Sequence, residues 1–286
     1  MPYAASDTLP LLMSDLIAES KPSDWRPLDP KNTLYLEFGS RRVIIELAPD
    51  FAPQHVANVR ALARERYWDG LAMVRVDDNY IVQWADPHAE NSELARTIRT
   101  ARETLPAEFD CAIDPDLPFH RLPDNDVYAE VVGFTNGFPI ARDEKDGRTW
   151  LVNTYGTVGS GRETDIHSGG GKELYSVIGH APRQLDRNVT AFGRVRLGIE
   201  FLSALPRGNC QAGFYQDVDS MLTISSVRLA SEVPLAQRTQ LEILRTDTAL
   251  FADIIESRRN RHDAWFYKPA GHIDIGNVPV PVRLVE

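Results

Sequence analysis

Short apolar stretches separated by polar turns recur along most of this chain, and this pattern limits the folds that it can adopt. The first two stretches, residues 34–38 and 43–47, flank a Gly-Ser-Arg turn at 39–41, which is typical of a β-hairpin. Further stretches of this kind lie at 71–76, 80–84, 150–155, 174–179, 191–197 and 221–229. Because few segments between them have helical spacing, the pattern predicts a mainly β fold, either a barrel or a sandwich.

A helix is expected directly after the first hairpin. Pro53 suits the first turn of a helix, Asp50 offers a cap, and apolar residues recur at helical spacing over 56–63. Before the hairpin, residues 1–32 contain several prolines that interrupt any long element. We expect these residues to form an N-terminal extension that lies over the domain.

The regular pattern is interrupted between residues 86 and 148. This region begins with a charged stretch of helical character at 93–102 and continues with several prolines and polar turns. So long a weakly patterned region inside one domain is usually functional or an insertion. We interpret it as an enlarged insertion in a domain that spans residues 33–230.

The pattern changes again beyond residue 230. Apolar residues recur at helical spacing over 236–244 and 248–261, with Thr246 or Asp247 as a cap between the two segments. The proline-rich end is expected to run extended. We therefore expect residues 231–286 to form a C-terminal helical extension packed on the domain.

Charge and hydropathy exclude several classes of partner. The formal net charge of −10 and the pI near 5.2 argue against nucleic acid, whose phosphates require a basic surface. No stretch approaches the length of a membrane span, and the start of the chain lacks the basic lead of a signal peptide. We expect no membrane partner and a cytoplasmic protein, or a periplasmic one if a signal has been removed. We also expect a monomer.

The two cysteines, Cys111 and Cys210, give no sign of a metal or disulfide framework. They lie far apart and neither belongs to a CxxC pair, although one long-range disulfide between them stays open. The histidines are scattered along the chain. We expect no metal and no cofactor.

Three blocks of sequence, in order, carry a resemblance to a known family. The first is 43–59 with the turn Tyr-Trp-Asp-Gly at 67–70, the second is 73–86, and the third comprises 172–175 and 185–195. Within the second block the matching positions are Arg75, Val76, Tyr80, Ile81, Gln83 and Asp86. In this order the blocks resemble cyclophilin-type peptidyl-prolyl cis-trans isomerases, and residues 173–179 resemble bacterial members. The resemblance implies a closed antiparallel β-barrel capped by helices.

The resemblance also implies a reaction. Rotation about a peptide C–N bond is opposed by about 18–20 kcal/mol, so an Xaa-Pro bond isomerises slowly without a catalyst. A guanidinium beside the proline nitrogen can stabilise the twisted amide, because it is always charged and directional. The family pattern assigns this catalytic role to Arg75, helped by Gln83. It assigns substrate binding to Tyr80, Ile81, Glu173, Tyr175 and Leu185, and it implies proline-containing polypeptides as partners.

This chain departs from the family pattern at several positions of the site. Gln184 stands where many cyclophilins have a Trp, Val189 where they have a His, and Glu173 where they have a Gln. The pair Trp84-Ala85 replaces Gly-Gly. We therefore expect an altered or weakened substrate preference and poor binding of cyclosporin-type ligands.

Two other functions compete with the isomerase. The departures from the family pattern favour a cyclophilin-fold chaperone or a proline-peptide binding module with little or no isomerase activity. A hydrolase or nucleotide-binding enzyme would have to use the glycine-rich segment 156–171, but no phosphate-binding or nucleophile motif is complete there. The isomerase is the better hypothesis.

Overall fold

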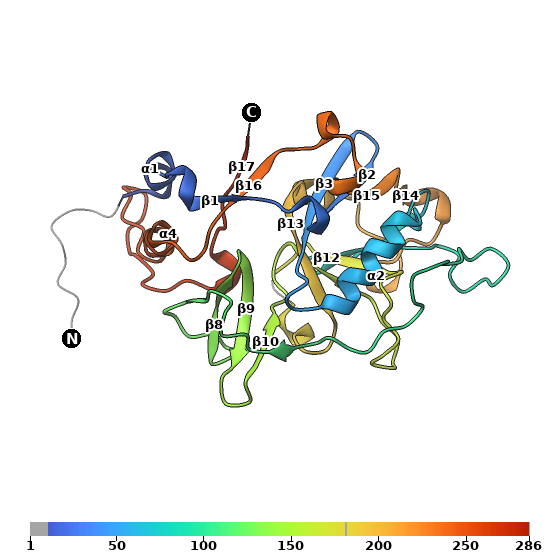
Figure 1. The fold of residues 1–286 in the computed structure, drawn as a ribbon, viewed down its shortest axis with the longest axis horizontal. Helices are drawn as coiled ribbons and strands as arrows, with labels where there is room; N and C mark the ends of the chain where they lie inside the picture. The colour runs from blue at the N-terminus through green and yellow to red at the C-terminus, as the bar shows by residue number, and fades with distance from the viewer. Residues whose placement is uncertain (1–10, 181, 286) are drawn as a thin grey trace.

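A nine-stranded antiparallel sheet forms the main body of the protein (Figure 1). The structure is a computed structural model that describes residues 11–180 and 182–285. The strands follow one another across this sheet in the order β14 (Leu222–Thr223), β4 (Ala72–Val76), β5 (Ile81–Ala85), β12 (Leu174–Val177), β11 (Thr157–Ser160), β13 (Ala191–Leu197), β3 (Arg41–Leu47), β2 (Thr33–Phe38) and β15 (Ser226–Leu229). The expected mainly β class is confirmed.

The sheet curls into a barrel that is not fully closed, so the expectation of a closed barrel was wrong in this detail. Its two edge strands, β14 and β15, follow each other directly in the sequence and do not pair with each other in the described chain. The residues between them bridge the gap instead. The amide of Ile224 donates to the carbonyl of Leu71 at 2.8 Å. The amide of Ser225 donates to the carbonyl of Glu37, also at 2.8 Å.

Helix α2 (Pro53–Arg64) packs on the main core of the barrel, where Trp68 and Phe192 are fully buried. Asp50 does not cap this helix. The carboxylate of Glu108 in the insertion accepts hydrogen bonds from the amides of Gln54 at 3.0 Å and His55 at 2.8 Å. The first-turn amides need acceptors, and here a distant segment supplies them.

A second sheet is formed mainly by the insertion, together with the strand β10 (Arg148–Leu151) that directly follows it. Its five strands are, in order, β6 (Cys111–Ala112), β10, β9 (Phe138–Asp143), β8 (Val131–Thr135) and β7 (His120–Arg121). The helix expected over 93–102 is absent from this described segment. Its amides at Arg99, Thr100 and Ala101 instead donate to the carboxylate of Glu65. Although burial alone would raise it, the hydrogen bond from the Thr100 hydroxyl and those from these amides lower the pKa of Glu65 to about 2.

A third sheet joins the two ends of the described chain, in the order β1 (Trp25–Pro27), β16 (Leu241–Leu244) and β17 (Val282–Leu284). The helix expected over 236–244 was therefore wrong. The segment pairs as a strand because it has a partner strand on each side. Its Leu241 and Ile243 pack on the outer face of the large sheet beside Tyr35 and Ile44.

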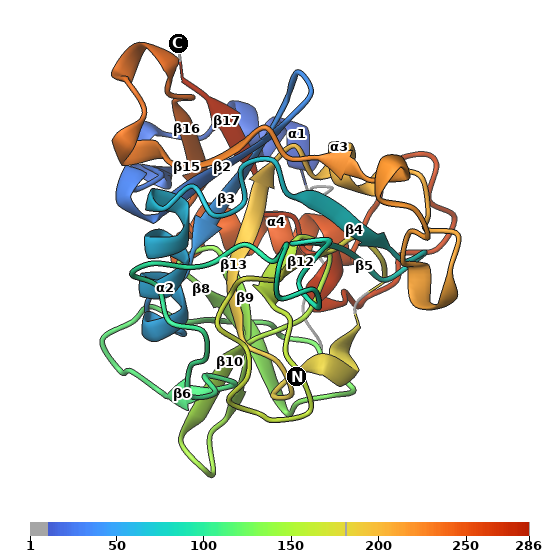
Figure 2. The same ribbon diagram turned by 90° about the vertical axis from the view of Figure 1, so that its right-hand side faces the viewer.

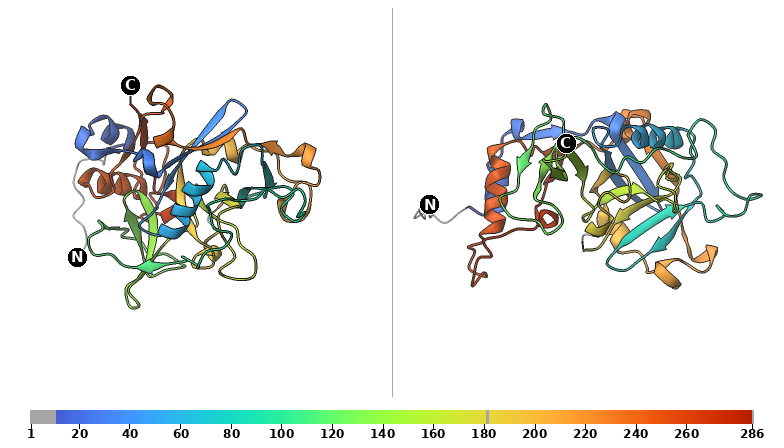
Figure 3. Two further views of the ribbon diagram at one scale, coloured as in Figure 1. Left: turned by 45° about the vertical axis from the view of Figure 1, so that its right-hand side comes forward. Right: turned by 90° about the horizontal axis from the view of Figure 1, so that it is seen from below.

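The second helix expected in the tail is present as α4 (Ala249–Arg259). Its cap is Thr248, whose hydroxyl accepts from the amide of Phe251 at 3.2 Å, rather than Thr246 or Asp247. Helix α1 (Met13–Ala18) lies against α4. Seen from below, α4, the green strands of the insertion and the large sheet succeed one another across the molecule (Figure 3).

The insertion, the tail and the N-terminal segment share a second hydrophobic core. Its buried side chains come from all three and include Trp25, Phe134, Trp150, Phe251 and Ile254. Of the expected N-terminal extension, residues 1–10 lie outside the described ranges. The division into 1–32, 33–230 and 231–286 stays a prediction.

One buried carboxylate connects the three sheets. Glu46 in β3 binds Arg26 of β1 at 2.8 Å and Arg196 of β13 at 2.7 Å, and its side chain is only 6% exposed. The same arginines donate to backbone carbonyls of the β8–β9 turn, Arg26 to Asn136 at 2.7 Å and Arg196 to Gly137 at 2.9 Å. Glu46 therefore fixes the insertion and the N-terminal segment against the barrel.

Within the described residues, none of the helices is both long enough and apolar enough to cross a membrane. Cys111 and Cys210 are both free. The long-range disulfide that the sequence left open is therefore not formed in this structure.

We predict that Glu46→Ala lowers the free energy of unfolding by about 3–5 kcal/mol, because it leaves buried Arg196 without its carboxylate. Glu232→Ala is the matched control, since Glu232 pairs with Arg64 at the surface and such pairs contribute about 0–1 kcal/mol. Denaturant unfolding monitored by circular dichroism measures both. Equal losses in the two variants would contradict the role given to Glu46.

Candidate active site

A cavity of about 320 Å³ on the large sheet brings together all seven site residues that the sequence indicates. They are Arg75, Tyr80, Ile81, Gln83, Glu173, Tyr175 and Leu185, and the cavity is also lined by Ser160, Gly161, Arg162 and Val189. Most of them lie on or beside the three paired strands β4, β5 and β12 (Figure 2). The structure thus places the predicted residues in one site, whereas their roles stay predictions.

Strand register explains why Arg75 points into this cavity. Arg75 in β4 lies opposite Gln83 in β5, which in turn lies opposite Tyr175 in β12. Between Met73 and Arg75 the register shifts by a β-bulge at Val74. Without the bulge, residues two apart would share a face. With it, Met73 enters the barrel core and Arg75 faces outward.

The guanidinium of Arg75 is held by three acceptors. Its Nη2 lies 2.8 Å from Asp77 Oδ2, its Nε donates to the carbonyl of Ala212 at 2.5 Å, and its Nη1 donates to Gln83 Oε1 at 3.4 Å. The rings of Tyr80 and Phe214 flank it, with centroids at 5.5 and 5.1 Å. Because a guanidinium carries five N–H groups, donors remain for a ligand.

The loop 206–216 carries Ala212 and Phe214, two of the residues that contact Arg75. Its Gly208 amide donates to the carbonyl of Val76 at 3.0 Å, and its Tyr215 amide donates to that of Val74 at 3.1 Å, so the loop lies along the edge of β4. Gly213 has a φ of +76°, and a Cβ there would lie 2.6 Å from the Cα of Asp77. Glycine is required for this approach.

Gln83 joins Arg75 to Glu173. Its side-chain oxygen accepts from Arg75, and its amide nitrogen donates to Glu173 Oε1. Burial raises the pKa of Glu173, as does the charge of Glu163, while Gln83 and Arg75 act in the opposite direction. A Cβ at Gly161 would collide with the Glu173 carboxylate, so glycine allows this side chain to lie along the cavity wall.

Tyr175 and Leu185 form two walls of the cavity. The Tyr175 side chain is buried, and its hydroxyl donates to Asn153 Oδ1 at 2.8 Å. A Cβ at Gly159 would lie only 2.5 Å from the Tyr175 ring carbon that bears this hydroxyl. Leu185 is carried by the single 3-10 turn Arg183–Leu185. Both walls therefore depend on residues outside the cavity.

Sequence reasoning missed several residues of this site. Asp77, Ala212 and Phe214 contact Arg75, and Ser160 and Arg162 line the cavity. Gly208 and Gly213 are the local sequence signal that loop 206–216 can lie close to β4. The other contacts arise from tertiary packing.

The comparisons with known proteins agree with this geometry. A family model described as cyclophilin type peptidyl-prolyl cis-trans isomerase/CLD matches residues 33–228. The chain belongs to the cyclophilin family. The match spans the large sheet together with the insertion.

Relatives of known name cover parts of this cyclophilin. Proteins named probable peptidyl-prolyl cis-trans isomerase from Brucella suis and Brucella abortus are 37% and 36% identical over 87 residues, which is 28% of this chain. The chain spans only 44% of their length. The crystal structure of cyclophilin AquaCyp293 from Hirschia baltica aligns with a TM-score of 0.75 at 24% identity, over 95% of this chain and 96% of that one. That likeness shows the fold alone, tail and insertion included.

The departures from the family pattern have different structural consequences. Val189 lines the cavity where cyclophilins commonly have a His, whereas Gln184 is exposed and does not line it. Trp84 is buried in the barrel core and does not line the cavity. The expected changes in substrate preference stay predictions.

In the part of the chain that the structure describes, no group of three or more His, Cys, Asp or Glu side chains is placed to hold a metal ion.

We predict that Glu173→Gln stabilises this cyclophilin increasingly as the pH rises from 4 to 8. A carboxyl whose pKa is raised on folding contributes stability below its ordinary pKa, and this contribution is lost as the pH rises through the raised pKa. Glutamine removes the titration and keeps an oxygen that can accept from Gln83. The measurement is the melting temperature of both proteins across this pH range, with Glu90→Gln as an exposed control. A difference that shrinks with rising pH would contradict the argument.

Proposed function

We propose that the protein is a peptidyl-prolyl cis-trans isomerase that acts on Xaa-Pro bonds of polypeptides. Membership of the cyclophilin family supports this activity. The observation that carries it is the placement of Arg75 and Gln83 in hydrogen-bond contact within one cavity that has apolar walls. The monomeric state and the cytoplasmic location stay predictions.

The catalytic step requires no covalent bond to form or break. As the amide twists, the proline nitrogen loses conjugation with the carbonyl and its lone pair becomes a hydrogen-bond acceptor. A remaining N–H of Arg75 donates to this nitrogen. Because Asp77, Ala212 and Gln83 already hold the guanidinium, it is preorganised for the twisted state, which is how fixed donors accelerate reactions.

The apolar residues of the cavity bind the proline ring, and its polar residues bind the substrate backbone. Tyr80, Ile81, Tyr175, Leu185 and Val189 enclose the proline ring. The side-chain nitrogen of Gln83 gives one hydrogen to Glu173 and keeps a second for a substrate carbonyl.

A proline-peptide binding module without useful catalysis is the second candidate. Two carboxylates favour it, because Asp77 neutralises Arg75 and Glu173 engages Gln83 before any substrate arrives. An isomerase assay separates the two functions.

We predict that Arg75→Ala lowers kcat/KM for a tetrapeptide containing Ala-Pro about 100-fold, which is typical of the loss of one preorganised donor. Arg75→Lys restores little, because a lysine lacks the planar fork that Asp77 and Gln83 hold. Spectrophotometric isomerisation kinetics measure both, with exposed Arg64→Ala as the control. A wild-type rate equal to that of buffer would favour the binding module.

Asp77 is predicted to position Arg75 through its oxygen rather than through its charge. Asp77→Ala removes one of three tethers and lowers kcat/KM about 3- to 10-fold, which corresponds to the loss of one hydrogen bond worth roughly 1 kcal/mol. Asp77→Asn keeps an acceptor oxygen and stays near the wild-type rate. The same kinetics measure the pair, and equal losses in the two variants refute the positioning role.

A further inference from the structure

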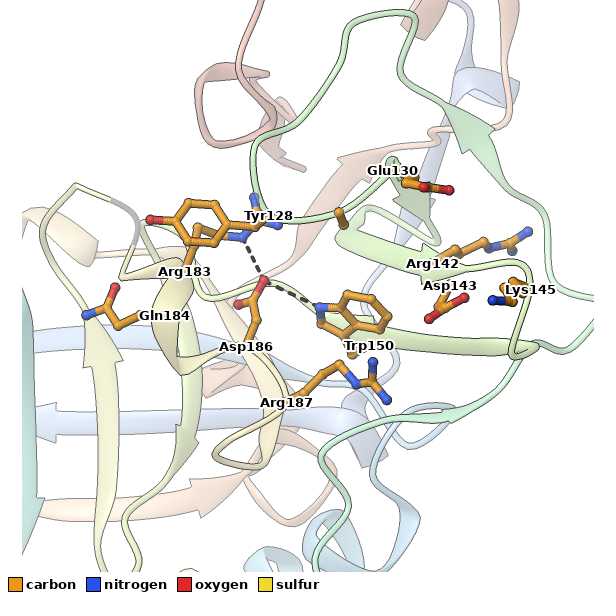
Figure 4. A pocket seen from close by; sticks show the side chains of 11 residues that line it. Tyr128, Glu130, Arg142, Asp143, Lys145, Trp150, Arg183, Gln184, Asp186 and Arg187 are labelled. Atoms are coloured by element: carbon orange, nitrogen blue, oxygen red, sulfur yellow. Dashed lines mark hydrogen bonds and ion pairs between the residues drawn. The ribbon is translucent and has the colours of Figure 1, made fainter.

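A second cavity, of about 480 Å³, adjoins the turn that carries Leu185. It is lined by Gln184 of this turn, by Asp186 and Arg187 directly after it, and by Tyr128 of the insertion and Trp150 of β10 (Figure 4). Leu185 lines the active-site cavity. The turn is therefore a shared wall, and its contacts on one side set the position of Leu185 on the other.

Buried charges attach this turn to the insertion. Arg183 binds both carboxylate oxygens of Asp126, at 2.7 and 2.9 Å, and its Nε donates to Asp186 Oδ2 at 2.7 Å. The exposed fractions of the three side chains are 3% for Arg183, 4% for Asp126 and 8% for Asp186. Buried charges must remain paired, so the turn cannot shift without unpairing Arg183.

The same network reaches Tyr175, which forms another wall of the active-site cavity. Asp186 Oδ1 accepts from the backbone amide of Asn153 at 2.8 Å and from its side chain at 3.2 Å. Asn153 Oδ1 then accepts from the hydroxyl of Tyr175 at 2.8 Å. Trp150 Nε1 also donates to Asp186, at 3.4 Å (Figure 4). One carboxylate thus connects the turn of Leu185 with the ring of Tyr175.

We propose that the insertion braces the active-site cavity, with Asp126, Arg183 and Asp186 as positioning residues that fix the spacing of Leu185 and Tyr175. None of the three lines the active-site cavity. Asp126 anchors Arg183 from the insertion, Arg183 holds Asp186, and Asp186 holds both walls. The insertion therefore sets how well the cavity fits a proline ring. This inference rests on the proposed function for the nature of the ligand.

The test compares Asp126→Asn with a matched control two residues away. Asp124 is also a buried carboxylate of the insertion, 7% exposed and bound to Arg259 at 2.7 and 2.8 Å, but it attaches the insertion to α4 and not to the turn. We expect Asp126→Asn to raise KM for an Ala-Pro tetrapeptide about 5- to 10-fold with kcat within about 2-fold, because misplaced walls weaken binding of substrate and twisted state alike. We expect Asp124→Asn to lower the melting temperature and leave KM unchanged.

Calorimetric measurement of the Kd for the same tetrapeptide tests the positioning role of the insertion separately from the proposed isomerase activity. If the wild-type protein binds the peptide without isomerising it, the proposed function fails, and the brace still predicts a 5- to 10-fold weaker Kd for Asp126→Asn. Equal changes of KM or Kd in the Asp124 and Asp126 variants, or none in either, would overturn the brace.

Tyr175→Phe provides an independent arm should Asp126→Asn fail to fold. It keeps the ring and removes only the hydroxyl that reaches Asn153. The brace predicts a rise in KM or Kd of about 2- to 3-fold in Tyr175→Phe, and unchanged binding in this variant would overturn the inference. Where Asp126→Asn does fold, the double variant is expected to show an effect smaller than the product of the two single effects, because the residues act through one network. Fully multiplicative effects would likewise overturn the inference.

Discussion

The arrangement of the three sheets depends on the carboxylate of Glu46. It lies in β3 of the large sheet and binds Arg26 from the N-terminal segment and Arg196 from β13. Both arginines also reach the turn of the insertion at 136–137. A carboxylate that is almost fully buried must keep its partners. Segments more than a hundred residues apart are therefore fixed to one another by a single side chain.

A similar constraint operates at the active site, where a bulge turns Arg75 out of the core. Once outside, its guanidinium is bound by Asp77, Ala212 and Gln83. Ordering a long side chain costs roughly 1.5–2 kcal/mol of conformational free energy. Because these contacts exist before substrate arrives, that cost is met during folding. The remaining N–H groups of Arg75 then face the cavity without a further loss of side-chain entropy on ligand binding.

Much of the fold and of the site could be predicted from the sequence, because strand alternation and the family pattern are local signals. Six of the seven site residues lie on or beside the neighbouring strands β4, β5 and β12, so their spacing in the family pattern already indicated that they meet, whereas Leu185 lies in a 3-10 turn. The strand at 241–244 could not be predicted, since its partners β1 and β17 come from distant parts of the chain. The contact of Ala212 with Arg75 was missed for a similar reason, because a loop delivers it.

Ion pairs of the insertion connect the tail to the active site. Arg259 of α4 binds Asp124, and two residues later Asp126 binds Arg183 beside Leu185. Both carboxylates are almost fully buried, so neither can give up its arginine without a large penalty. A structural relative of 24% identity aligns over 95% of this chain, which covers these added segments too. The insertion and the tail are thus integral to this variant of the cyclophilin fold, because buried ion pairs attach the tail to the insertion and the insertion to the turn of Leu185.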